Sequence, residues 1–303
     1  MQTRRQFLAS LTRLVTCAAL APAIGQARAG LLSRTIPGTN ETLPVIGLGT
    51  GSAFDISPTD PVRMPMCRKV IQVFLQAGAR VIDTAPGFGR AERITGELLG
   101  QAGARDQVFL VTRASAIGRM AGERQTQASL KALQTDLLDL VLVHDLLDAR
   151  TQLRRLRALK EAGKVRYIGL SHHLDSSHDD LLEILQKEPV DFAQFNYSAG
   201  NRHAEQRLLP YCADQGIAVL INRPYMQGNL LGALTSRPLP AVAQELQASS
   251  WAQLLLKFIL AQPAVTAVIP GTGNPLHMAD NLLAGQGPLP DAGQRTEIIR
   301  QLA

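Results

Sequence analysis

Residues 138–171 read LDLVLVHDLLDARTQLRRLRALKEAGKVRYIGLS, and this stretch is the clearest evidence of the fold. Its two ends, Leu138–His144 and Val165–Ser171, are short apolar runs of the kind that form strands buried on both faces. Between them, residues 153–162 have a helical period and stop before Gly163, a residue that commonly ends helices. A strand, a crossover helix and a second strand predict a parallel sheet.

The same alternation of apolar runs and helical periods continues through the chain from residue 44 onward. The other six predicted strands are Ile46–Thr50, Arg80–Ala85, Val108–Arg113, Phe192–Tyr197, Ala218–Arg223 and Thr266–Pro270. Helices are predicted over residues 67–77, 91–100, 179–186 and 204–215, with glycine stops at Gly78, Gly103, Gly163 and Gly216. Eight such units predict an α/β protein with a (β/α)8 TIM barrel.

Two additions to the barrel are predicted. Residues 34–37 and 42–45 flank a Gly-Thr-Asn-Glu turn and read as an N-terminal β-hairpin that caps the bottom of the barrel. An extra helix near residues 242–262, with Trp251 and Phe258 on one face, lies before the eighth strand.

The first 29 residues have the features of a twin-arginine signal peptide. Residues 3–8 read TRRQFL, residues 14–24 are a modest apolar stretch, and Ala27-Arg28-Ala29 is a cleavage signal. The apolar stretch is too short to span a bilayer, so a protein that is not membrane-embedded after cleavage is expected. We therefore predict a signal peptide over 1–29, a barrel domain over 30–303, the twin-arginine export machinery as a partner, and a periplasmic location.

Charge and cysteine content narrow the classes of partner. Without the signal segment, 27 basic residues face 25 acidic ones, because the segment carries four of the 31 Lys and Arg residues and none of the acids. No basic run with interleaved aromatic residues occurs, so nucleic acid is not an expected partner. Cys67 and Cys212 fall on separate predicted helices, so we expect two buried free thiols.

Polar residues interrupt the apolar runs where the predicted strands end, and in such barrels the site lies at the carboxyl ends of the strands. Asp83 and Arg113 end neighbouring strands and are expected to pair. His172 and His173 follow another strand, but adjacent residues of an extended segment point to opposite faces, so no metal site is predicted. The remaining strand-end candidates are His144, Ser171, Gln194, Asn196, Tyr197, Asn222, Arg223, Gly271 and Thr272.

Three stretches carry a resemblance to a known family. Residues 83–92, DTAPGFGRAE, resemble the D-T-A-x-x-Y-G-x-x-E stretch of the aldo/keto reductases, and residues 163–171, GKVRYIGLS, resemble their G-K-V-R-x-I-G-x-S. Residues 268–275, VIPGTGNP, with Asp280-Asn281-Leu282, are similar to their I-P-G-T-x-N-P and E-N-L. The resemblance covers the chain after residue 29. It implies NADPH-dependent carbonyl reduction by hydride transfer, with an Asp, a Tyr, a Lys and a His around the carbonyl oxygen.

Two of these four positions match and two differ. Asp83 and His144 match, whereas Phe88 stands at the position of the proton-donating tyrosine and Arg113 at that of the lysine. A phenyl ring has no proton to give, and general acid catalysis is typically worth about 10²–10⁴-fold in rate. Arg113 does not deprotonate but can present N–H donors to an oxyanion. His144 is the remaining candidate acid, because imidazole titrates near neutrality.

The resemblance also implies NADP or NAD as cofactor, and an exported protein is expected to hold it tightly. Ser171 and Gln194 match contacts to the nicotinamide amide, while His172 replaces an asparagine and Asn222 replaces a stacking aromatic. His277 stands where an arginine commonly grips the 2′-phosphate of NADP. The loop that opens the last barrel helix is predicted to hold phosphate on its N–H groups. The implied residues at this end are Gly271, Thr272, Gly273, Asn274, His277, Asp280 and Asn281.

Three interpretations remain open at this point. The first is an NAD(P)-dependent oxidoreductase that acts on a carbonyl or alcohol substrate with altered acid–base chemistry. The second is a catalytically inactive barrel that binds nucleotide, a metabolite or a protein partner. The third is an enzyme of another class built on the same barrel, since a fold does not fix a function.

Overall fold

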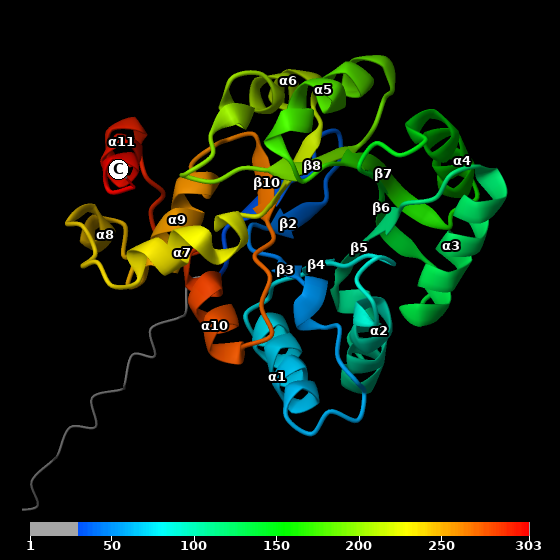
Figure 1. Cartoon of the computed structure of the whole chain (residues 1–303), viewed down its shortest axis with the longest axis horizontal. Helices are drawn as coiled ribbons and strands as arrows, with labels where there is room; N and C mark the ends of the chain where they lie inside the picture. Colours follow the sequence, from blue (N-terminus) through cyan, green and yellow to red (C-terminus); the bar gives the residue numbers. More distant parts are fainter. Residues whose placement is uncertain (1–29, 303) are drawn as a thin grey trace, which may run out of the picture.

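Eight parallel strands form one curled sheet in the computed structural model, which describes residues 30–302. The sheet order is β10-β9-β8-β7-β6-β5-β4-β3, and two parallel bridges, Ile46 with Val268 and Gly49 with Gly271, join its two edge strands. Figure 1 shows the strands at the centre and helices outside them. This is the predicted (β/α)8 barrel. The predicted signal peptide lies outside the described residues.

All eight predicted barrel strands are present. Two of them, β6 (Leu138–His144) and β7 (Val165–Ser171), have the predicted bounds, and the other six are shorter or shifted by a few residues. Those six are β3 (Leu48–Gly49), β4 (Val81–Asp83), β5 (Phe109–Ala114), β8 (Phe192–Asn196), β9 (Ala218–Asn222) and β10 (Val265–Val268).

Helices connect successive strands and cover the outside of the barrel (Figure 1). The four glycines predicted as helix stops all have positive φ, between 59° and 78°, which confirms that role. The covering helices are α1 (Arg63–Gln76), α2 (Ala91–Ala102), α3 (Arg119–Ala132), α4 (Ala149–Glu161), α5 (His178–Lys187), α6 (Leu208–Gln215), α9 (Trp251–Leu260) and α10 (Pro275–Leu283).

The single helix predicted over residues 242–262 is wrong in its extent. The structure has two helices there, α8 (Val242–Glu245) and α9, and Gln247 between them has a φ of 54°. The Ser250 side chain accepts a hydrogen bond from the N–H of Gln253 and so starts α9 as an N-cap, which the continuous apolar period concealed. Because α9 is the crossover helix from β9 to β10, the elements beyond the regular pattern are α7 (Asn229–Leu234), α8 and α11 (Ala292–Arg300).

The predicted N-terminal hairpin is present as β1 (Ser33–Thr35) and β2 (Thr42–Pro44), which pair antiparallel. Ile36 and Leu43 belong to the buried cluster formed by the inward-facing strand residues. Glu41, in the turn, accepts hydrogen bonds from Arg166 and Tyr167 near the start of β7. These contacts place the hairpin at the amino-terminal ends of the strands, opposite the end where the site is predicted.

The two cysteines of the described residues are free and buried, as predicted. Cys67 lies on α1 and Cys212 on α6, and burial raises the pKa of both thiols, to about 12 for Cys212. None of the helices within residues 30–302 has the length and apolar content that a membrane span requires.

Candidate active site

Most of the strand-end residues predicted from the sequence converge on one small cavity. It has a volume of about 300 Å³ and lies at the carboxyl ends of the strands. Eight predicted residues line it: Asp83, Phe88, Arg113, His144, Ser171, His172, Gln194 and Asn222.

Asp83, Arg113 and Gln194 form a closed hydrogen-bonded triangle on the wall of this cavity. Arg113 Nη2 lies 2.9 Å from Asp83 Oδ2 and donates to Gln194 Oε1 at 2.6 Å. Gln194 Nε2 in turn donates to Asp83 Oδ1 at 2.9 Å. The predicted pairing of Asp83 with Arg113 is therefore confirmed. The amide oxygen and nitrogen of the buried Gln194 both bond to this ion pair, so the side chain has hydrogen-bond partners without a ligand.

Phe88 lies against the same arginine. The guanidinium carbon of Arg113 is 5.2 Å from the centre of the Phe88 ring, and Arg113 Nη1 donates to the carbonyl oxygen of Thr84 at 2.5 Å. Arg113 Nε is buried and has no hydrogen-bond partner among the described residues. The cavity wall thus combines a fixed cation with an apolar ring, and this part of the wall offers no group that can give up a proton at neutral pH.

His144 sits at the end of β6, where its Nδ1 is 3.3 Å from Ser171 Oγ and 3.5 Å from Asp145 Oδ1. Burial, and then the positive charge of Arg113, lower the pKa of His144 to about 4. The expectation that His144 titrates near neutrality is therefore wrong. At pH 7 its imidazole is neutral and donates hydrogen bonds without serving as a cationic acid.

His172 and His173 lie side by side rather than on opposite faces. Their rings stack with centres 5.3 Å apart and planes 9° from parallel. The alternation expected of extended chain ends with β7 at Ser171, so the two histidines belong to the following loop. The argument used against a metal site is therefore wrong.

Asn222, at the end of β9, shows how a nicotinamide would fit this cavity. Its Nδ2 donates to the carbonyl oxygen of His172 at 3.1 Å, while its Oδ1 is buried without a hydrogen-bond partner among the described residues. An orphaned buried acceptor is costly unless a ligand satisfies it. A carboxamide N–H₂ group supplies such a donor, so Asn222 fits a nicotinamide although it offers no aromatic face.

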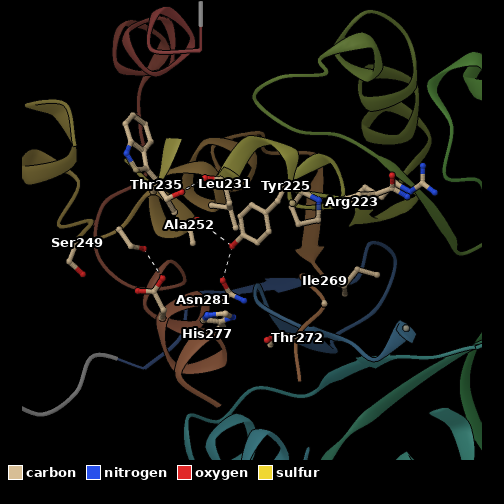
Figure 2. Close-up of a pocket in the computed structure, with 18 of the residues that line it drawn as sticks. Arg223, Tyr225, Leu231, Thr235, Ser249, Ala252, Ile269, Thr272, His277 and Asn281 are labelled. Carbon is tan, nitrogen blue, oxygen red and sulfur yellow. Dashed lines mark hydrogen bonds between the residues drawn. The ribbon is translucent and has the colours of Figure 1, made fainter. Parts of the chain in front are cut away.

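A second, larger cavity of about 940 Å³ adjoins the first, and Gly51, Arg223 and Ile269 line both. Figure 2 shows it between the loop after β9 and helix α10. Five residues predicted for the phosphate end of the cofactor line it: Gly271, Thr272, His277, Asp280 and Asn281. The two cavities therefore lie next to each other, and the larger one is of the size that cofactors occupy.

Gly273 and Asn274 are not among the residues that line this cavity, and their contact with a cofactor stays a prediction. Asn274 Oδ1 accepts from Leu276 N at 2.9 Å and caps α10, and Thr272 Oγ1 accepts from Asn274 N at 3.0 Å. Pro275, the first residue of α10, has no N–H. Side chains of the loop itself therefore satisfy two of the N–H groups that were predicted to hold phosphate.

Several residues of the larger cavity were missed from the sequence. Tyr225 donates from its hydroxyl to Asn281 Oδ1 at 2.7 Å, as Figure 2 shows, and Ser250 Oγ is 2.7 Å from Asp280 Oδ2. Trp251 also lines the cavity, although its spacing had indicated a buried helix face. The sequence did contain one indication for Tyr225: it follows the end of β9 by three residues, and in such barrels the site lies at the strand ends.

Comparisons with known proteins agree with this geometry. The Aldo/keto reductase family model matches residues 45–296. The NADH-specific methylglyoxal reductase of Escherichia coli is 31% identical over 239 residues, which cover 68% of this chain and 71% of that protein. Aldo-keto reductase YhdN of Bacillus subtilis is 32% identical over 182 residues, 55% of this chain and 54% of YhdN. The crystal structure of an aldo/keto reductase from Klebsiella pneumoniae in complex with NADP and acetate has a TM-score of 0.75 and 26% identity, and covers 89% of this chain and 96% of that one.

The fold and the site define an oxidoreductase-type (β/α)8 barrel whose polar cleft opens at the carboxyl ends of its strands. Within that class, the chain belongs to the aldo/keto reductase family.

Proposed function

We propose that this protein is an NAD(P)-dependent oxidoreductase that interconverts a carbonyl compound and its alcohol with altered proton chemistry. The observation that carries the proposal is that the small cavity around Asp83, Arg113 and His144 shares three lining residues with the 940 Å³ cavity beside α10. A nicotinamide cofactor, when bound, supplies or accepts the hydride. Asn222 would hold its carboxamide, and His277, Asp280 and Asn281 would line its adenosine end.

The chain's own residues define what this cleft does for a carbonyl oxygen. Arg113, held by Asp83 and Gln194, is a fixed cation that stabilises the negative charge that develops on that oxygen. Phe88 gives no proton, and His144 is neutral at pH 7, so the proton comes from water. Water has access, because the side chains of His144 and His173 are 28% and 31% exposed.

This chemistry favours substrates whose alkoxide is weakly basic. Electron-poor carbonyls such as α-dicarbonyls and quinones accept hydride readily and need the least help from a strong acid. Methylglyoxal, the substrate named for the Escherichia coli relative, is an α-dicarbonyl and is the first compound to test.

The proposal is tested with the purified exported protein. Oxidation of NADPH and NADH is followed at 340 nm with methylglyoxal, a quinone and an unactivated aldehyde, and nucleotide binding is followed by fluorescence. We expect binding, turnover of the first two compounds, and much slower turnover of the aldehyde. Absence of both nucleotide binding and turnover would refute the proposal.

One observation favours a second candidate, a catalytically inactive barrel that binds nucleotide, a metabolite or a protein partner. The tyrosine position is a phenylalanine, and the remaining histidine is held neutral by burial. The same assay separates the two candidates, since an inactive barrel oxidises neither nucleotide in the presence of any of the three compounds.

Residues 1–29 support export through the twin-arginine machinery to the periplasm. Signals of this type are associated with proteins that cross the membrane folded, and a cofactor held tightly during transport would remain with the protein. Replacing Arg4 and Arg5 by lysine in the full chain is expected to leave uncleaved precursor in the cytoplasm. Absorbance and fluorescence of the exported protein would show whether reduced nicotinamide leaves with it, and export that is unchanged by the two substitutions would refute this route.

A further inference from the structure

We propose that His144, Asp145 and His173 form a binding site for one divalent transition-metal ion at the mouth of the cleft. One ligand atom from each residue lies within 4.8 Å of those of the other two. Asp145 Oδ1 is 3.0 Å from His173 Nδ1 and 3.5 Å from His144 Nδ1. Ligand atoms about 2.1 Å from a tetrahedral zinc ion are roughly 3.4 Å apart, so both distances are close to those of a formed site.

Two strand ends produce this arrangement. Asp145 directly follows β6 and has a φ of 49°, a left-handed conformation that turns its carboxylate back beside His144. His173 lies in the loop after β7, beyond the point where side chains alternate between faces. Two neighbouring strands thus contribute the three ligands. His144 and Asp145 come from the end of β6, and His173 follows the end of β7, where His144 pairs with Ser171.

His172 lies beside these three residues but is not one of the proposed ligands. Its Nδ1 accepts from the backbone N–H of Leu174 at 3.1 Å, so the proton of the neutral ring is on Nε2. Nε2 faces Asp145 Oδ1 at 3.7 Å. This distance is longer than a hydrogen bond, so in the proposal His172 is a positioning residue that lies beside the carboxylate, outside the ligand set.

The surroundings of Asp145 suit a metal. Asp145 Oδ1 lies between 3.0 and 3.7 Å from a ring nitrogen of each of the three histidines, His144, His172 and His173. A divalent ion bound between the ligand atoms would place a positive charge beside this carboxylate.

The ligand set indicates the kind of ion and site. Two imidazoles and one carboxylate suit Zn²⁺, Co²⁺, Ni²⁺ or Fe²⁺, and three protein ligands leave coordination positions for water or substrate. His144 and His173 also line the 300 Å³ cavity with Arg113. If the proposed function holds, the ion would act as a Lewis acid on the carbonyl oxygen. It would do so in a cleft where no side chain donates a proton to that oxygen.

The test uses the mature protein after removal of metals with a chelator. Titration with Co²⁺, followed by its visible absorption, and with Zn²⁺, followed by calorimetry, should show one ion bound per chain. His173→Ala and Asp145→Ala should each weaken binding at least 100-fold, and His172→Phe about 10–100-fold. His277→Ala removes an exposed histidine on α10 and should leave the affinity unchanged.

Circular dichroism of each variant checks that loss of metal binding is not loss of fold. Failure of the wild type to bind either ion would overturn the proposal. Equal weakening by His277→Ala would do so as well, because it would show binding that is not specific to the three ligands. Nucleotide binding is measured on the same metal-free protein, so failure of the metal site and failure of the proposed function are separate results.

Discussion

The guanidinium of Arg113 lies over the ring of Phe88, 5.2 Å from its centre. A cation in this position is attracted to the ring face, by up to about 2 kcal/mol when water is excluded. In the proposed function these two residues occupy the positions of a proton-donating tyrosine and its lysine. The pair keeps a positive charge at the site but has no hydroxyl group that could donate a proton to a substrate.

Restoring the family residues at both positions should restore the proton path. The double variant Phe88→Tyr with Arg113→Lys is expected to raise kcat for an unactivated aldehyde by roughly 10²–10⁴-fold, the usual contribution of a general acid. The measurement is NADPH oxidation at 340 nm, with methylglyoxal expected to gain less because its alkoxide needs the acid less.

Two single variants serve as controls for this prediction. Phe88→Leu removes the ring without adding a hydroxyl and should bring no gain, and Phe88→Tyr alone should gain less than the double variant because Arg113 cannot relay a proton. If the double variant binds NADPH but gains nothing, the cleft lacks more than a proton donor.

The buried triangle of Asp83, Arg113 and Gln194 should matter for stability as well as chemistry. Asp83→Ala leaves the Arg113 charge without its anion at a site where both side chains are 5% exposed. Loss of one member of a buried pair typically costs about 3–5 kcal/mol in the free energy of unfolding. Urea unfolding measures this cost.

The matched control for Asp83→Ala is Arg119→Ala. The pair of Arg119 with Glu123 is on the surface, with side chains 79% and 41% exposed, and should contribute less than about 1 kcal/mol. Similar losses for the two variants would show that the buried triangle carries no special share of the stability.

Local patterns in the sequence were sufficient for the barrel itself. The strands β6 and β7 are mainly apolar and each ends in a polar residue, His144 or Ser171. A stretch of helical period ending at Gly163 separates them, so their bounds could be predicted. The pairing of Asp83 with Arg113 followed from adjacent strand ends. The N-cap at Ser250 was missed, because the apolar period on both sides of it hides a break in the helix.

The finer features of the site depend on contacts that no local pattern contains. Gln194 holds Asp83 from 111 residues away in the chain. The stacking of His172 on His173 depends on the loop backbone, and the lowered pKa of His144 depends on burial by distant segments. These are tertiary properties, which is why residue type gave the wrong titration for His144 and strand alternation gave the wrong argument about a metal.

The buried His144 should make the fold sensitive to acid. Its pKa is about 4 in the folded chain, against an ordinary 6.5. Between these two pH values the imidazole is protonated in the unfolded chain and neutral in the folded chain. Stability is therefore complete above pH 6.5 and falls as the pH drops toward 4, by up to about 3 kcal/mol from this group. His144→Gln should lose less stability between pH 7 and pH 4.5.

Urea unfolding of chelator-treated protein at the two pH values measures this difference. His172 and His178 also have lowered pKa values through burial and remain in both proteins, so only the contribution of His144 is compared. An identical loss of stability in wild type and His144→Gln would contradict the assignment.

His277 should control the choice between NADP and NAD. It is exposed on α10 and lines the larger cavity beside Asn281 (Figure 2), at the position where the resemblance implies an arginine for the 2′-phosphate. A charge-assisted hydrogen bond is worth about 1.5–3 kcal/mol, so His277→Arg should tighten NADPH binding by roughly 10–100-fold and leave NADH binding nearly unchanged. Fluorescence titration with each nucleotide gives the ratio of the two affinities.

His203→Arg makes the same substitution at an exposed histidine outside the cavity and should leave this ratio unchanged. A parallel shift in both variants would mean that added positive charge, rather than the position of His277, attracts the phosphate.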